Sequence, residues 1–241
     1  MDYFKKYLKV APFSHALWRS LEARAIQKIK IRPPVLDIGC GFGEFAGVFF
    51  EKMVEMGVDV NCQDLFLAAQ KKKYKKTVFA DARNLPFADK SFNTVFSISV
   101  LEHIEGVEPV FGEAYRVLKK GGLFIYTVPT KDVNQMLVLP KVFHFAFKHK
   151  SVFAKSGWLK MAKKAGFGII DQGGTISKKQ LKFYELGLLF AWPTQVNRFF
   201  FKKRLLFSPK WRVELLANLF KGLLAENKAT PANIIVVAKK K

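Results

Sequence analysis

Glycines and carboxylates follow the predicted buried strands in the first third of the chain. The stretch VLDIGCGFGEF, residues 35–45, passes from apolar residues through three alternate glycines into an amphipathic run. Glycines remove Cβ atoms where a strand turns sharply into a helix, so a ligand can lie against bare backbone and the helix amide groups. The pattern predicts a ligand-binding loop formed by Gly39, Gly41 and Gly43.

The spacing of this loop argues against a dinucleotide. The dinucleotide fingerprint is G-x-G-x-x-G, and Glu44 stands where that fingerprint requires its last glycine. A glutamate at this point would repel a pyrophosphate. The loop therefore favours a ligand without phosphates.

Two further carboxylates suit an adenosine. Asp59 ends the next predicted strand, in GVDVN, and a carboxylate at this position can accept both ribose hydroxyls. Asp81 ends the strand after that, in ADARNLPF, where a carboxylate can accept from an exocyclic adenine amine. Each aspartate has a simpler interpretation, as a capping or turn residue. Taken in order, the three motifs predict an adenosine pocket without a phosphate site.

Four stretches together resemble the class I S-adenosylmethionine-dependent methyltransferases, in the branch that includes quinone-biosynthesis enzymes. They are VLDIGCGFGEF, GVDVN, DARNLPFADKSFNTVFSISVLEHI and EAYRVLKKGGLFIYTVP, and they span residues 33–130. The resemblance implies S-adenosylmethionine as the cofactor, with the methionine portion near Asp37 and the glycines. The cofactor-binding residues that it implies are Asp37, Gly39, Cys40, Gly41, Gly43, Asp59, Val60, Asp81, Ala82 and Ser97.

Methyl transfer from a sulfonium is an in-line displacement, so positioning and desolvation do most of the work. A general base is needed only where the acceptor must lose a proton. VLEHIEG supplies Glu102 and His103 after the fourth predicted strand, and His103 is the candidate catalytic base. The alternative is that both residues only cap a loop. The other histidines, His15, His144 and His149, lack ligand-like spacing, and no metal site is predicted.

Predicted strands alternate with helices up to residue 130, which is typical of a Rossmann-like, doubly wound, mostly parallel sheet. The terminal segment PANIIVVAKKK resembles the antiparallel seventh strand of the family. We expect an N-terminal helical segment at 1–32, with an amphipathic helix over 14–30 that Ser14 caps. A further helix over PVFGEAYRVLKK is expected to end at Gly121 and Gly122. The methyltransferase domain is expected at 33–241, with helical lid or insert segments at 131–160 and 175–230.

Charge divides the chain into two unlike halves. The chain of 241 residues has a formal net charge of +22, with 19 basic and 14 acidic residues in 1–130 but 22 and 5 in 131–241. Such an excess indicates an anionic partner. Aromatic residues are interleaved with the cations of the second half. The examples are Trp192, Arg198, Phe199, Phe200, Phe201, Lys202, Lys203, Arg204 and Trp211.

Aromatic residues beside cations suit a membrane interface, so we expect a small-molecule or lipid-like acceptor and an anionic membrane surface as a partner. The same residues could instead form the core and solvated face of an insert. An RNA methyltransferase is the alternative function, although SISV stands where base-amino methyltransferases carry an NPPY-type tetrapeptide. A non-catalytic binding protein is a third class, which the intact loop and Asp59 disfavour.

Localisation is expected to be cytoplasmic, with peripheral attachment to the inner membrane face. No apolar run of about 18 residues predicts a transmembrane helix, and the N-terminus lacks the apolar core of a signal peptide. The two cysteines, Cys40 and Cys62, do not form a disulfide framework. The sequence does not indicate the acceptor atom or the oligomeric state.

Overall fold

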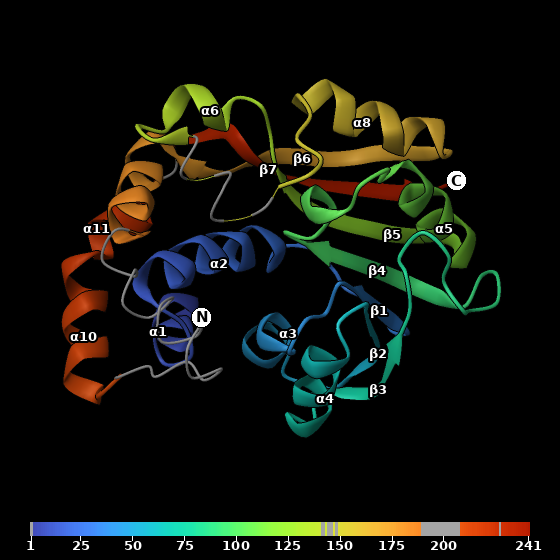
Figure 1. Cartoon of the computed structure of the whole chain (residues 1–241), viewed down its shortest axis with the longest axis horizontal. Coiled ribbons are helices and arrows are strands. Elements are labelled where there is room, and N and C mark those ends of the chain that lie inside the picture. The colour runs from blue at the N-terminus through green and yellow to red at the C-terminus, as the bar shows by residue number, and fades with distance from the viewer. Residues whose placement is uncertain (1, 141–142, 144–146, 148, 189–207, 227) are drawn as a thin grey trace.

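A computed structural model describes residues 2–140, 143, 147, 149–188, 208–226 and 228–241. In these residues a seven-stranded sheet runs through the molecule in the order β3-β2-β1-β4-β5-β7-β6, with helices on both faces (Figure 1). The strands are β1 (Val35–Ile38), β2 (Val54–Asp59), β3 (Tyr74–Phe79), β4 (Phe92–Ile98), β5 (Leu118–Pro129), β6 (Phe167–Ser177) and β7 (Ala229–Lys240).

The first five strands are parallel, and β7 is antiparallel to both β5 and β6. The predicted Rossmann-like fold with an antiparallel last strand is therefore confirmed. Strand order reverses between β1 and β4, which are direct neighbours. In open α/β sheets the carboxyl ends of the strands at such a point form the ligand crevice.

Two apolar cores hold the helices to the faces of the sheet. One core joins the sheet to α1, α2, α3 and α4, with α10 and α11 farther out. The other joins it to α5 and α8. The bounds are α1 (Tyr3–Leu8), α2 (Phe13–Ile26), α3 (Glu44–Phe49), α4 (Cys62–Gln70), α5 (Glu108–Val117), α6 (Val133–Met136), α8 (Lys155–Lys164), α10 (Lys210–Leu219) and α11 (Lys221–Ala225).

Three predicted helix ends were wrong, two in α2 and one in α5. Helix α2 begins at Phe13 after Pro12, so Ser14 lies inside the helix rather than capping it, and the helix ends at Ile26 rather than near residue 30. Helix α5 ends at Val117, and Gly121 lies within β5 rather than in a helix cap. The chain leaves α5 early because Leu118 already pairs with Phe92 of β4.

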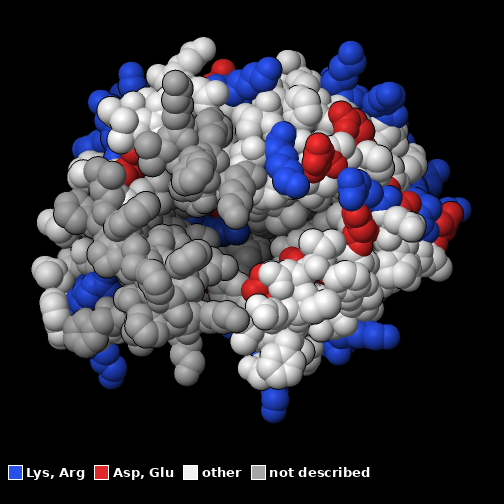
Figure 2. Space-filling model, viewed as in Figure 1, with Lys and Arg blue, Asp and Glu red and all other residues white. Residues whose placement is uncertain are grey.

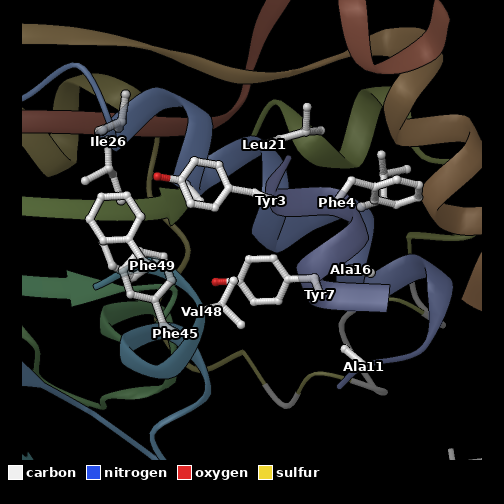
Figure 3. Packing of buried hydrophobic residues seen from close by; sticks show 14 of the residues in the cluster. Tyr3, Phe4, Tyr7, Ala11, Ala16, Leu21, Ile26, Phe45, Val48 and Phe49 are labelled. Carbon is white, nitrogen blue, oxygen red and sulfur yellow. The ribbon is translucent and has the colours of Figure 1, made fainter. Parts of the chain in front are cut away.

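Helix α1 lies within the segment 1–32 that was expected to be helical, although no separate helix was predicted before residue 14. It is anchored by aromatic packing. Tyr3 stacks on Phe49 of α3 with ring centroids 5.7 Å apart, and Phe49 stacks on Phe45 at 5.1 Å. Figure 3 shows Tyr3 and Tyr7 of α1 on the side of these α3 side chains, with Phe4 on the side away from them. The segment before residue 32 therefore belongs to the same core as the sheet.

A buried carboxylate fixes α2 across the sheet. Glu22 is fully buried, and its Oε1 accepts from Ser99 Oγ at 2.6 Å and from Thr127 Oγ1 at 2.7 Å. The same oxygen accepts from Asn233 Nδ2 at 3.2 Å, while Oε2 pairs with Arg19 at 3.0 Å. One side chain of α2 thus binds groups from β4's end, β5 and β7.

Within the described residues, no helix combines the length and apolar character needed to cross a membrane. Of the aromatic and basic cluster predicted in the second half, all members except Trp211 lie in residues 189–207, outside the described residues. His144 also lies outside them.

Replacing Glu22 with alanine should be strongly destabilising. The change leaves the Arg19 cation and the side-chain donors of Trp18, Ser99, Thr127 and Asn233 without this acceptor. The loss is expected to cost about 3–5 kcal/mol of unfolding free energy. Chemical denaturation measures this, with the exposed Glu51→Ala as the matched control, expected to change stability by less than about 0.5 kcal/mol. A loss for Glu22→Ala as small as the control's would contradict the anchoring role.

Candidate active site

The carboxyl ends of the parallel strands border a cavity of about 430 Å³. It lies where the sheet topology places a ligand crevice. Its lining contains five of the ten residues predicted to bind the cofactor (Gly39, Asp59, Val60, Asp81 and Ala82), together with the predicted base His103. The lining residues are Gly39, Val58, Asp59, Val60, Ala80, Asp81, Ala82, Arg83, Val100, His103, Ile104, Glu105 and Lys150.

The glycine loop follows β1 with backbone angles that favour glycine. Gly39 has φ +73° and Gly41 has φ +49°, both in the left-handed region. A Cβ at Gly39 would overlap the side chain of Val100, whereas a Cβ at Gly41 would meet no atom within 4 Å. The backbone at Gly41 is therefore open on the side where a side chain would stand.

Asp59, at the end of β2, supports this loop directly. Its Oδ2 accepts from the Gly41 amide at 2.8 Å, and its Oδ1 accepts from the Asn61 amide at 2.9 Å. The carboxylate is fixed in orientation by these bonds and lines the cavity. A carboxylate has about four acceptor sites, so capacity for ribose hydroxyls remains.

Asp81, after β3, lines the same cavity but has a strong partner. Arg83 Nη2 lies 2.7 Å from Asp81 Oδ2, and this hydrogen-bonded guanidinium holds the pKa of Asp81 below its usual range. The pair is half exposed, so its energetic contribution is small. Asp81 therefore stays ionised and is available as an acceptor, beside the buried Ala82.

The other five predicted cofactor residues do not line this cavity. Asp37 is buried and accepts from Tyr74 Oη at 2.6 Å, and Cys40 is a buried thiol whose pKa is raised by burial. Gly41 and Gly43 continue the loop. Ser97, the remaining candidate, is fully buried in β4, and its Oγ has no hydrogen-bond partner among the described groups.

The residues present fit S-adenosylmethionine. Two carboxylates at neighbouring strand ends face a cavity that reaches the bare backbone of the glycine loop. Glu44, at the start of α3, is buried and its Oε1 lies 2.6 Å from His15 Nε2. A carboxylate at this point opposes a phosphate, as the sequence predicted, and agrees with a cofactor that has none.

A second cavity of about 140 Å³ adjoins the first, and His103 lines both. One wall carries the aromatic residues Trp18, Phe143, Phe147 and Tyr184, and the other residues that line it are His15, Arg19, Ser99, Glu102, His103, Pro129 and His149. The Trp18 and Tyr184 ring centroids lie 4.8 Å apart. The N-terminal segment and both predicted insert segments thus meet here.

Glu102, His103 and His149 form a cluster between the cavities. Their side-chain donor atoms all lie within 4.8 Å of one another, a grouping that could hold a metal ion. The absence of a metal remains a prediction. Burial raises the pKa of Glu102 to about 8, and its Oε2 has no hydrogen-bond partner in the described part of the chain.

Sequence reasoning missed His149 and the polar face of α2. His149 reaches His103 because the Lys150 and Ser151 amides donate to the Glu102 carbonyl at 2.8 and 2.9 Å. That contact joins segments about 46 residues apart and leaves no local motif. The polar face of α2 could have been predicted from the sequence. Its residues stand at the i, i+3, i+4, i+7 spacing of one helix face: His15, Trp18, Arg19 and Glu22.

Comparisons of the sequence identify the domain. Residues 36–126 match the methyltransferase domain family. The sterol 24-C-methyltransferase of Schizosaccharomyces pombe is 28% identical over 190 residues, which cover 70% of this chain and 49% of that protein. The malonyl-[acyl-carrier protein] O-methyltransferase of Legionella pneumophila is 30% identical over 138 residues, which cover 54% of this chain and 48% of that protein. The chain spans about half the length of these two relatives.

Solved structures show the same fold at low identity. A methyltransferase of Thermotoga maritima superposes with a TM-score of 0.62 at 18% identity, and the match covers 95% of this chain and 91% of the Thermotoga chain. The [4+2]-cyclase SpnF superposes with a TM-score of 0.63 at 18% identity, and the match covers 96% of this chain and 83% of the SpnF chain. The fold alone therefore does not determine the reaction.

Residues 36–126 carry a class I S-adenosylmethionine-dependent methyltransferase domain, as the motifs predicted. The cofactor prediction is confirmed with it: S-adenosylmethionine is the cofactor of this domain. The roles of the individual site residues remain predictions.

Asp59→Asn should weaken S-adenosylmethionine binding about 10- to 100-fold. The change removes the charged acceptor proposed for the ribose hydroxyls, which should reduce the binding free energy by roughly 1.5–3 kcal/mol. Calorimetric titration gives the dissociation constant. Asp171→Asn, on the exposed part of β6, is the matched control and should leave affinity unchanged. Equal affinities for Asp59→Asn and wild type would remove Asp59 from the site.

Asp37 should make stability fall as pH rises. Burial, only partly offset by the Tyr74 hydrogen bond, raises the pKa of Asp37 from 3.8 to about 7. The folded protein therefore holds this proton between about pH 4 and pH 7 while the unfolded chain releases it, so the free energy of unfolding falls across that window. Denaturation curves at several pH values should show a weaker fall for Asp37→Asn. Identical pH profiles would contradict the assignment.

Proposed function

We propose that the protein transfers a methyl group from S-adenosylmethionine to a small-molecule or lipid-like acceptor. The observation that carries this proposal is the pair of adjoining cavities with His103 in both linings. One cavity has the carboxylates for an adenosine and the other has aromatic walls. Relatives are named for methylation of sterols and of malonyl-[acyl-carrier protein], which supports an acceptor of this kind.

The bound cofactor supplies a methyl group that is already activated as a sulfonium. The chain's own residues hold the two reactants. Asp59 and Asp81 orient the adenosine half, and the aromatic residues that line the second cavity exclude water from the acceptor. His103, at the junction, is placed to accept a proton or a hydrogen bond from the acceptor.

Substitution of His103 tests the proposal. His103→Ala should reduce the rate of methyl transfer about 100-fold while leaving cofactor affinity unchanged. The assay supplies S-adenosylmethionine with separated lipid, small-molecule and RNA fractions of the source cell, and calorimetry gives the affinity. Turnover on the small-molecule or lipid fraction is expected. Methylation confined to the RNA fraction would reverse the proposal in favour of the RNA alternative.

A membrane surface is the partner that we propose for the basic second half. Helix α10 exposes Trp211, Leu215 and Leu219, which are 64, 57 and 69% exposed and recur every four residues along one stripe. Cations at Lys210, Arg212 and Lys221 flank the stripe. Figure 1 places α10 at the edge of the molecule, and Figure 2 shows Lys and Arg around the margin of the same face.

The α10 stripe should insert into anionic bilayers. Trp211→Asp combined with Leu215→Asp should weaken co-sedimentation with phosphatidylglycerol vesicles at least tenfold, because two apolar anchors leave the interface. Phe66→Asp, an exposed aromatic on α4, is the control and should bind like wild type. Binding of wild type should weaken with salt without being abolished. Vesicle binding unaffected by the double change would reject the stripe as the contact.

A further inference from the structure

The second cavity has the size and walls of a site for one aromatic ring. Its volume of about 140 Å³ is close to the ~150 Å³ of an engineered cavity that binds benzene. Trp18 and Tyr184 line it with ring centroids 4.8 Å apart, and the Phe143 ring centroid lies 6.1 Å from that of Tyr184. Aromatic walls of this kind pack on the faces and edges of a flat ring.

The ionisable side chains at this cavity are mostly basic. Arg19 and three histidines line it, and Glu102 is the one acidic residue among the described residues of the lining. Glu22, the carboxylate that pairs with Arg19, lies outside the lining. A guanidinium group stays charged throughout the pH range in which proteins are folded. The lining therefore favours a ligand that carries a negative charge.

Arg19 is bound to the fold through a single nitrogen of its guanidinium group. Nη1 donates to Glu22 Oε2 at 3.0 Å and to the Ile98 carbonyl oxygen at 2.9 Å. In the described part of the chain, Nε and Nη2 have no hydrogen-bond acceptor. These two nitrogens carry parallel N–H groups along one edge, and that edge matches the two oxygens of a carboxylate. The side chain is only 19% exposed, so water has little access to it.

We propose that the methyl acceptor is a small aromatic carboxylate and that Arg19 binds its carboxylate group. This inference rests on the proposed methyltransferase function and specifies the class of acceptor. The ring packs against the aromatic walls, and the carboxylate pairs with the Nε–Nη2 edge. Glu22 and the Ile98 carbonyl hold Arg19 in place before the acceptor arrives, which lowers the cost of ordering the side chain on binding. Arg19 thus selects the acceptor and takes no proton from it.

Benzoate is the probe, and benzamide is its neutral counterpart of nearly the same shape. Benzoate should bind at least about tenfold more tightly than benzamide, because hydrogen bonds between charged partners are roughly twice as strong as neutral ones. Acetate, which lacks the ring, should also bind at least about tenfold more weakly than benzoate, because it buries little apolar surface. Titration of the full chain in EDTA, followed by NMR, gives the three dissociation constants. Equal affinities for benzoate and benzamide would contradict the role of Arg19, and equal affinities for benzoate and acetate would contradict the ring.

Arg19→Lys keeps a positive charge beside Glu22 but removes the Nε–Nη2 edge. The change should weaken benzoate binding at least about tenfold and alter benzamide binding by less than about twofold. The exposed Arg32→Lys is the matched control and should bind both probes like wild type. A second measurement needs no variant: in wild type labelled with 15N-arginine, one Nε–H resonance should shift on addition of benzoate and none on addition of benzamide.

Thermal unfolding and S-adenosylmethionine titration of each variant report on folding and on the cofactor site. Normal cofactor binding with no benzoate-induced shift would overturn the carboxylate assignment and leave the proposed function standing. Failure of wild type to bind S-adenosylmethionine would instead contradict the proposed function. Benzoate binding that appears only when Zn²⁺ is added would assign the carboxylate to the cluster of Glu102, His103 and His149 and overturn the role of Arg19.

Discussion

The buried Glu22 carboxylate is the constraint on which the rest of the site depends. A charge inside a protein persists only where partners satisfy it, and Glu22 has donors from the end of β4, from β5 and from β7, with Arg19 beside it. These bonds fix both the axial position and the rotation of α2 over the carboxyl edge of the sheet. An apolar contact alone would fix neither, because hydrophobic burial is non-directional.

This placement divides the carboxyl edge into two compartments of different chemistry. Along β1, β2 and β3 the edge is polar, with Asp59 and Asp81 facing the larger cavity. Beneath α2 the lining is rich in aromatic residues, with Trp18 as part of the wall. His103 lies in the lining of both. A displacement reaction needs its two reactants in line and shielded from water, and adjoining compartments of these two kinds meet both needs.

The strands and the glycine loop could be predicted because their signals are local. Strand β1, the glycines and Asp59 are read from residue types within a few positions of one another, and the parallel topology follows from alternation of strands with helices. Partners such as Glu22 with Asn233, or His103 with His149, are separated by 211 and 46 residues and share no pattern. Their association depends on tertiary packing. The predicted end of α5 was wrong for a similar reason. Leu118 pairs with Phe92 of β4, so the helix ends before the glycines that the sequence pattern indicated as its end.

The central claim is that the two cavities are one active site, with the cofactor's reactive end at their junction. A crystal structure of the full chain with S-adenosylhomocysteine tests this most directly. The account predicts the ribose hydroxyls on Asp59, the adenine beside Asp81 and Ala82, and the sulfur at the His103 end, facing the cavity bounded by Trp18 and Tyr184. A nucleoside bound elsewhere, or a sulfur directed away from that second cavity, would contradict it.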